Sequence, residues 1–159
     1  MLNRKIFKTV ALSFGLIVLG VMLGAYLFSG VQPRSFLSIH KCEEHCLSRK
    51  ELLGLIGSLV VQKVPGVLPS ILMETDKTIA FEHPNPAMPI HYMIVPKRDI
   101  KDISDISADD QEYLIDAFAV MRALIEEHHL TNYRIVTNGP GVQQVRYLHF
   151  HLLAQKPKS

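Results

Sequence analysis

The residues with the clearest chemical potential lie near the C-terminus, where an aromatic residue and two histidines alternate with apolar residues. This segment reads Tyr147-Leu-His149-Phe-His151-Leu-Leu. Because successive side chains of a β-strand point to opposite faces, Tyr147, His149 and His151 are expected on one face and the apolar residues on the other, toward the core. A neutral imidazole is both nucleophile and general base near pH 7. A neighbouring imidazole can donate a hydrogen bond to a phosphoryl oxygen as charge develops there.

Other interpretations of these histidines stay open on the residues alone. The pair can be solvent-facing on a half-buried strand, or it can bind metal, with His91 as the third ligand of a zinc ion. Cys42 and Cys46 pose a similar choice, since they would share a face of a helix. A disulfide there would be geometrically tight, a metal site with nearby histidines would have an unusual spacing, and two inert thiols are the third interpretation.

The C-terminal segment, together with several segments before it, resembles the histidine-triad family of nucleotide hydrolases and transferases. The signature of that family alternates three histidines with apolar residues and ends in two apolar ones. Ser70–Phe81 resembles the first hairpin of the family, and Pro89–Lys97 resembles its proline-histidine strand. The resemblance runs from about Leu59 to Gln155. It implies an α+β fold and a homodimer that pairs through the helix and a sheet edge.

The resemblance also implies a mechanism. In that family the middle histidine attacks the α-phosphorus of a nucleotide conjugate, and water then hydrolyses the nucleotidyl-histidine. Carried over by position, the nucleophile is His149, and His151, His91 and Asn138 complete the predicted catalytic group. The predicted substrate-binding residues are Gln143, Gln144, Tyr147, His83 and Phe81.

Three of these positions depart from the family pattern. Tyr147 replaces the first histidine of the triad, and a phenol with a pKa of about 10 does not readily share protons at neutral pH. Turnover is therefore expected to be slowed. Gln144 stands where many members have a serine that assists the leaving group, and His83 where nucleotide hydrolases often place an acid against the ribose hydroxyls. With tyrosine at 147 we expect neither the zinc that some members carry nor another cofactor.

The elements that must position these residues form a mixture of helical and extended patterns. Leucine, isoleucine and valine residues recur at helical spacing over Glu51–Lys63. A longer helix from Ala108 to about His128, capped by Ser107, would bury a stripe that includes Phe118. The expected fold class is α+β, an antiparallel sheet with helices packed on one face. Strands are expected at Ile71–Glu74, Ile79–Glu82, His91–Val95, Tyr133–Thr137 and Tyr147–Leu153.

The N-terminal segment differs in character from the rest of the chain. Arg4, Lys5 and Lys8 precede a stretch without charge that ends at Pro33. About twenty apolar residues cross the ~30 Å hydrocarbon layer, and this stretch is longer than the core of a usual signal peptide. We therefore expect an uncleaved membrane helix, with a cytoplasmic N-terminus and the domain outside the cytoplasm. The predicted parts are a basic flank and anchor over 1–33, a polar linker over 34–50, and the α+β domain over 51–159.

The distribution of charged residues along the chain indicates which classes of partner the domain can bind. All 15 acidic residues follow the apolar segment, whereas three of the 17 basic residues precede it, so the domain is close to neutral. A near-neutral domain argues against binding of nucleic acid, which needs clustered cations. We expect a membrane-anchored hydrolase that cleaves a phosphorus ester, anhydride or phosphoramidate of a nucleotide conjugate. The alternative is a catalytically weak module that binds a nucleotide or another phosphorylated ligand at the membrane.

Overall fold

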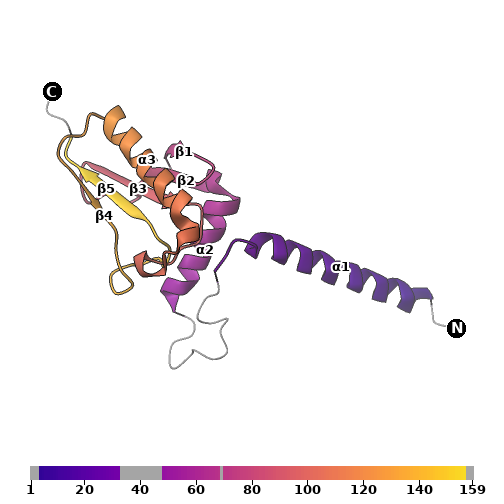
Figure 1. Cartoon of the computed structure of the whole chain (residues 1–159). Helices are drawn as coiled ribbons and strands as arrows, with labels where there is room; N and C mark the ends of the chain where they lie inside the picture. Colours follow the sequence, from indigo (N-terminus) through magenta and orange to yellow (C-terminus); the bar gives the residue numbers. More distant parts are fainter. Residues whose placement is uncertain (1–3, 33–47, 69, 157–159) are drawn as a thin grey trace. The chain divides into compact units, whose positions relative to one another are not determined.

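The computed structural model describes residues 4–32, 48–68 and 70–156 (Figure 1). The chain divides into two units, Met1–Gly30 and Val31–Ser159. Most of the predicted linker, with Cys42 and Cys46, lies outside the described residues. The three interpretations of these cysteines therefore stay predictions.

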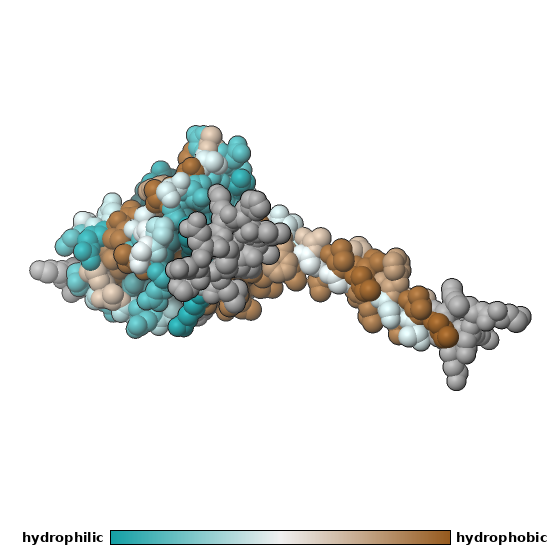
Figure 2. All heavy atoms as spheres, turned by 90° about the horizontal axis from the view of Figure 1, so that it is seen from below, coloured by the Kyte–Doolittle hydropathy of each residue, from teal (hydrophilic) through white to brown (hydrophobic). Residues whose placement is uncertain are grey.

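The first unit is a single helix, α1 (Arg4–Phe28). Its stretch Lys8–Phe28 has 21 residues, is apolar enough to cross a membrane, and has none of its residues buried. Figure 2 shows apolar side chains along most of the exposed helix. At a rise of 1.5 Å per residue this length matches the ~30 Å hydrocarbon layer. A signal sequence near an N-terminus has the same length and composition, so the helix is a candidate membrane span.

The second unit is built on one antiparallel sheet of five strands, in the order β1-β2-β3-β5-β4. The strands nearest in sequence pair as hairpins, and β5 enters between β3 and β4, so the C-terminal strand lies inside the sheet. Its neighbours on both sides hold its register firmly. The strands are β1 (Ile71–Glu74), β2 (Thr78–Glu82), β3 (Ile90–Pro96), β4 (Tyr133–Val136) and β5 (Phe150–Ala154).

One face of the sheet packs against the long helix α3 (Gln111–Glu127). A single 3₁₀ turn, η4 (Ala108–Asp110), comes before α3, and Asp110 accepts hydrogen bonds from the backbone N–H and hydroxyl of Ser107 there. The predicted cap at Ser107 is thus present, but it caps a 3₁₀ turn rather than the α-helix itself. The buried helix residues are Ala117, Val120, Met121 and Leu124. Phe118, predicted to be buried, is 53% exposed.

The helix α2 (Arg49–Lys63) begins at Ser48, whose hydroxyl accepts the backbone N–H of Glu51. It contributes Val61 to a second apolar cluster on the sheet face away from α3. The predicted apolar side of this helix is only partly covered, and Leu52 and Ile56 are exposed. The helix α2 is rotated about its axis relative to the prediction, so that a carboxylate and small residues face the domain. Its buried residues are Glu51, Gly54, Ser58 and Val61. A short 3₁₀ turn, η2 (Pro65–Val67), ends this segment, and another, η3 (Ile103–Asp105), lies between β3 and α3.

The predicted alternation along the last strand is confirmed, although the strand is shorter than predicted. Leu148, Phe150 and Leu152 belong to the core under α3, which leaves His149 and His151 on the other face. The ladder begins at Phe150 because the N–H of Leu148 donates to the carbonyl of Ile100, outside the sheet. Beside it, β4 ends one residue early, where the hydroxyl of Thr137 donates to the carbonyl of His149. The predicted α+β fold class is confirmed.

Candidate active site

Three segments of the sheet bring four histidines to the face opposite α3. His91 lies on β3 and His151 on β5, while His149 comes directly before β5. The backbone N–H of His83, which follows β2, donates to the carbonyl of His91 at 2.9 Å and continues the pairing of β2 with β3. The order β2-β3-β5 therefore places residues from distant parts of the chain side by side.

These four side chains form a continuous series of rings, which we call the histidine row: His83, His91, His151 and His149. The rings of His83 and His91 stack, with centroids 4.1 Å apart. The centroid of His151 lies 5.1 Å from that of His91 and 4.9 Å from that of His149. His91 and His149 are each 8% exposed. The predicted catalytic histidines are thus neighbours in space.

Hydrogen bonds from the backbone fix where the protons of the row lie. The N–H of Ala87 donates to Nδ1 of His91 at 3.1 Å. A neutral imidazole has one N–H and one lone pair, so His91 carries its proton on Nε2. That nitrogen lies 2.9 Å from Nδ1 of His151 and donates to it. His151 in turn carries its proton on Nε2 and presents a hydrogen-bond donor.

In His149, the candidate nucleophile, the proton lies on Nδ1 rather than on Nε2, unlike in His91 and His151. Nδ1 of His149 lies 2.7 Å from the carbonyl oxygen of Tyr147, which can only accept, so the proton of His149 is on Nδ1. Its Nε2 therefore keeps a lone pair. His149 and His151 together offer one nucleophilic nitrogen and one N–H donor from adjacent rings, which is the combination that attack on phosphorus needs.

The electrostatics of the row favour uncharged rings. Burial lowers the pKa of His149, and the hydrogen bond to Tyr147 opposes this shift only in part. The pKa of His151 falls to about 4, first through burial and then through His149, His91 and His83. Burial and the neighbouring His83 also lower the pKa of His91. At neutral pH these pKa shifts favour the uncharged form of His91, His149 and His151.

Asn138 is the other predicted catalytic residue that reaches the row. Its Nδ2 lies 3.4 Å from Nε2 of His151. Because this His151 nitrogen carries the proton, a half-turn of the amide presents its oxygen as acceptor. Asn138 follows β4 by two residues and is half-buried, so it is placed to orient His151 or a ligand beside it.

Three other predicted ligand-binding residues, Tyr147, Phe81 and Gln143, are buried in the domain. The hydroxyl of Tyr147 donates to the carbonyl of Pro96 at 2.7 Å, and its ring packs with Phe81 in the second apolar cluster. Gln143 is buried and donates to the carbonyl of Lys101 at 3.1 Å. Gln144 is exposed. Tyr147, Phe81 and Gln143 are therefore packing residues as they lie, although the buried Oε1 of Gln143 has no hydrogen-bond partner among the described residues.

The ring nitrogens of His83, His91 and His151 lie within 4.8 Å of one another, a spacing that a metal ion could use. The hydrogen bonds argue against a good fit. His91 uses both nitrogens, one with Ala87 and one with His151, and its ring is within 8° of parallel to His83. Parallel stacked rings do not aim their lone pairs at one point. As the side chains lie, the three rings form a hydrogen-bonded stack, and the expected absence of metal stays a prediction.

Sequence reasoning missed the contacts that hold the loop before His149. Arg146 lies 3.1 Å from Oε1 of Glu51 on α2 and 3.6 Å from Oδ2 of Asp102. Its N–H donates to the carbonyl of Lys50, and Nζ of Lys50 donates to the carbonyls of Pro140 and Gly141. We call these contacts between α2 and residues 140–146 the loop clasp. They join residues far apart in sequence, so no local pattern signals them.

Comparison with known proteins agrees with this fold. A family model described as "Scavenger mRNA decapping enzyme C-term binding" matches residues 67–159. The crystal structure of a HIT (histidine-triad) family hydrolase from Legionella pneumophila Philadelphia 1 is 30% identical, with a TM-score of 0.56, and the match covers 64% of this chain and 95% of that one. The chain belongs to the histidine-triad family.

Individual relatives differ in how much is known of them. An uncharacterised HIT-like protein of Synechococcus elongatus is 32% identical over 102 residues, which cover 62% of this chain and 87% of the relative. The purine nucleoside phosphoramidase of Escherichia coli is 27% identical over 107 residues, covering 65% of this chain and 87% of the enzyme. A HIT family hydrolase from Clostridium thermocellum is 31% identical, with a TM-score of 0.56, and the match covers 63% of this chain and 94% of that chain.

Proposed function

We propose that this protein hydrolyses a phosphorus ester, anhydride or phosphoramidate of a nucleotide conjugate through a covalent intermediate on His149. The observation that carries the proposal is the set of hydrogen bonds to backbone groups and between rings, which assigns a lone pair to Nε2 of His149 and a proton to Nε2 of His151. The similarity to hydrolases of the family, and to a purine nucleoside phosphoramidase, supports the choice of substrate class.

The reaction has two displacement steps. In the first, Nε2 of His149 bonds to phosphorus, the bond from phosphorus to the leaving group breaks, and the leaving group takes a proton from water. Positive charge grows on the ring of His149, where the carbonyl of Tyr147 stabilises it. The N–H of His151 donates to a phosphoryl oxygen. In the second step a water oxygen bonds to phosphorus, the bond to His149 breaks, and the water proton passes to solvent.

A trapping experiment tests this mechanism. The purified protein is mixed with adenosine 5′-phosphoramidate, quenched, and examined by peptide mass spectrometry. We expect a nucleotidyl adduct on His149 that is absent in His149→Ala and kept in His129→Asn, an exposed histidine outside the row. Binding of the nucleotide without adduct or turnover would contradict the enzyme and support the catalytically weak binding module.

We infer that α1 anchors the protein in a membrane, with the N-terminus in the cytoplasm and the domain outside it. The length and apolar character of Lys8–Phe28 support an anchor, and the basic residues before it support this orientation. Fusions of a topology reporter to the C-terminus test the orientation. N-terminal sequencing of the mature protein separates an anchor, which keeps Lys8–Phe28, from a cleaved signal sequence, which loses it.

We also propose that the protein is a homodimer. The exposed side of α3 carries Ile115 and Phe118, which line an open groove of about 590 Å³ with Leu114. The ring of Phe118 contacts that of Phe150 on β5, with centroids 5.7 Å apart. Ile135, opposite Leu152, lies on the same face of the edge strand β4 and is 39% exposed. This apolar strip (Ile115, Phe118 and Ile135) beside an unpaired strand edge suits a second copy of the chain.

A further inference from the structure

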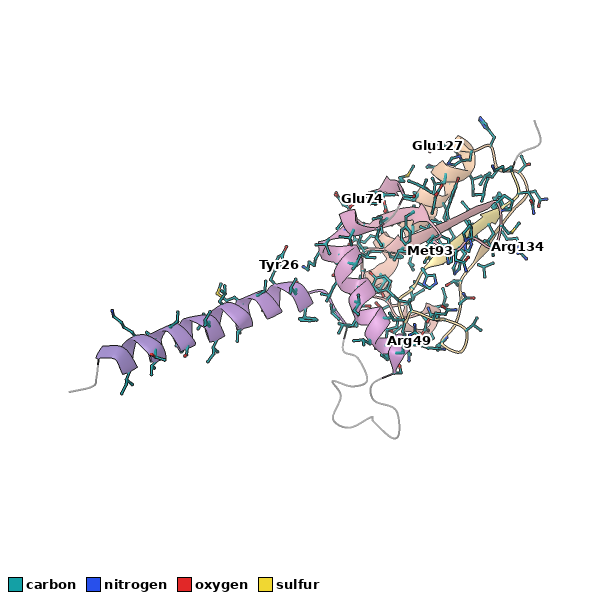
Figure 3. The ribbon with its side chains drawn as sticks, turned by 180° about the vertical axis from the view of Figure 1, so that it is seen from behind. Tyr26, Arg49, Glu74, Met93, Glu127 and Arg134 are labelled. Atoms are coloured by element: carbon teal, nitrogen blue, oxygen red, sulfur yellow. The ribbon has the colours of Figure 1, made fainter. Side chains whose placement is uncertain are left out.

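The end of the histidine row away from His149 has features that the proposed reaction does not use. His91 pairs with Leu153 across the sheet, and Leu153 pairs with Arg134 on β4. Residues directly opposite one another in a sheet share a face, so Arg134 lies on the face of the histidines. Figure 3 shows Arg134 and Glu74 at opposite edges of the sheet, with Met93 between them.

The loop after β2 brings Arg134 close to this end of the row. Ala87 and Met88 are consecutive residues of that loop. The N–H of Ala87 contacts the ring of His91, and Sδ of Met88 lies 3.8 Å from the guanidinium of Arg134. The cation is therefore held beside the loop that starts at His83. We call His83 and Arg134 together the anion end of the row.

His83 contributes a donor to the anion end. The backbone N–H of Asn85 donates to Nδ1 of His83 at 3.0 Å, so the N–H that the ring offers to a ligand is on Nε2. A ligand hydroxyl that needs an acceptor finds none on this ring, because the lone pair is taken by Asn85. A group that accepts hydrogen bonds is favoured instead.

Among the described residues next to His83 in the sequence, the one acid does not share its face of the sheet. Glu82 directly precedes His83, but it pairs with Tyr92, whose ring belongs to the core under α3, so its carboxylate lies on the opposite face. An N–H donor and a guanidinium on the same face of the sheet are groups that bind an anion.

We propose that the anion end, formed by His83 and Arg134, binds a second phosphate of the substrate, on the ribose of the same nucleotide whose 5′-phosphorus is attacked by His149. This inference rests on the proposed function and names its substrate class, a nucleotide conjugate that is also phosphorylated on the sugar. The spacing suits one nucleotide. The rings of His149 and His83 lie on either side of His151, with centroids 4.9 and 5.8 Å from it.

A comparison of three substrates tests the proposal. The full-length protein is assayed with adenosine 5′-phosphoramidate and with its 3′-phosphorylated and 2′-phosphorylated analogues. We expect kcat/KM to be at least about tenfold higher for one of the phosphorylated analogues, the effect of one charge-assisted hydrogen bond. In Arg134→Gln this ratio should fall toward one. Arg122→Gln, an exposed arginine on α3, should keep the ratio of the unmodified protein.

The outcomes separate this inference from the proposed function. Equal kcat/KM for all three substrates, or an unchanged ratio in Arg134→Gln, would overturn the inference and leave the mechanism at His149 intact. If no substrate is turned over, calorimetry compares adenosine 5′-monophosphate with adenosine 3′,5′-bisphosphate and its 2′,5′ isomer. Tighter binding of a bisphosphate that is lost in Arg134→Gln would then support the anion end alone. Equal affinities would overturn it.

Discussion

His149 is oriented by a carbonyl two residues before it, and in the proposed mechanism this contact takes the place of an acidic side chain. The oxygen of Tyr147 holds the proton on Nδ1, and burial keeps the ring uncharged by lowering its pKa. Both effects leave Nε2 available for phosphorus. A main-chain group can do this only because the chain before β5 leaves the sheet at Leu148, where its N–H bonds to Ile100.

The pH dependence of the reaction follows from these shifts. In the proposed mechanism the neutral form of His149 is the active one, and its pKa lies below the ordinary value of 6.5. The pKa of His151 falls to about 4. We expect kcat/KM to keep more than half of its neutral-pH value at pH 6.5 and to fall only in more acidic buffer. A profile with its midpoint at or above pH 6.5, for a substrate that does not titrate there, would contradict this reading.

Tyr147 offers a second test at the residue scale, because its side chain and its carbonyl have different roles. Tyr147→Phe removes the donor to the carbonyl of Pro96 inside an apolar cluster. We expect the free energy of unfolding to fall by about 1–3 kcal/mol, measured by urea denaturation. The carbonyl that orients His149 remains, so kcat should change by no more than about twofold. A large loss of kcat with unchanged stability would show that the phenol takes part in the chemistry.

At the scale of elements, α2 and the loop before β5 form one mechanical unit. The loop clasp joins Glu51, which is buried, to Arg146, which is 36% exposed. Lys50 adds two bonds to the carbonyls of the loop. Since the loop leads directly into Tyr147 and His149, the position of α2 determines how firmly the nucleophile is held.

The loop clasp can be loosened with one substitution. Glu51→Gln leaves Arg146 with weaker partners. We expect the free energy of unfolding to fall by about 2 kcal/mol. This is less than for a fully buried pair, because Arg146 is 36% exposed. Hydrogen exchange should speed up over residues 140–146. Glu112→Gln is the matched control, since Glu112 is 62% exposed and pairs with Lys77 at 3.3 Å. Equal effects of the two substitutions would rule out the clasp as a brace.

The sequence was sufficient for features that depend on local periodicity. The alternation along the last strand predicted that His149 and Phe150 lie on opposite faces of the sheet. The helical spacing of apolar residues predicted α3. It was insufficient where a distant partner changes what is buried: Glu51 turns inward because Arg146 meets it, and this rotates the apolar side of α2 outward. The stacking of His83 on His91 is of the same kind, since only the pairing of two strands brings these rings together.

At the scale of the whole molecule, the proposed dimer depends on the apolar strip. Phe118 is 53% exposed although the helical pattern predicted its burial, which is the behaviour of an interface residue. Phe118→Lys should shift the protein from dimer to monomer in light scattering, with the dissociation constant raised about tenfold or more. Val67→Lys, at an exposed apolar position on η2 outside the strip, should leave the dimer unchanged. A monomeric unmodified protein would contradict the dimer.

The direction of every proton from Ala87 to His151 is decided by one peptide N–H. The side chain at position 87 takes no part in this hydrogen bond, so any amino acid with a backbone N–H can supply it. Proline has no N–H and would remove the hydrogen bond. His91 could then hold its proton on either nitrogen, and His151 would turn from donor to acceptor in part of the molecules. The acid–base polarity of the centre is thus encoded in the backbone of a surface loop.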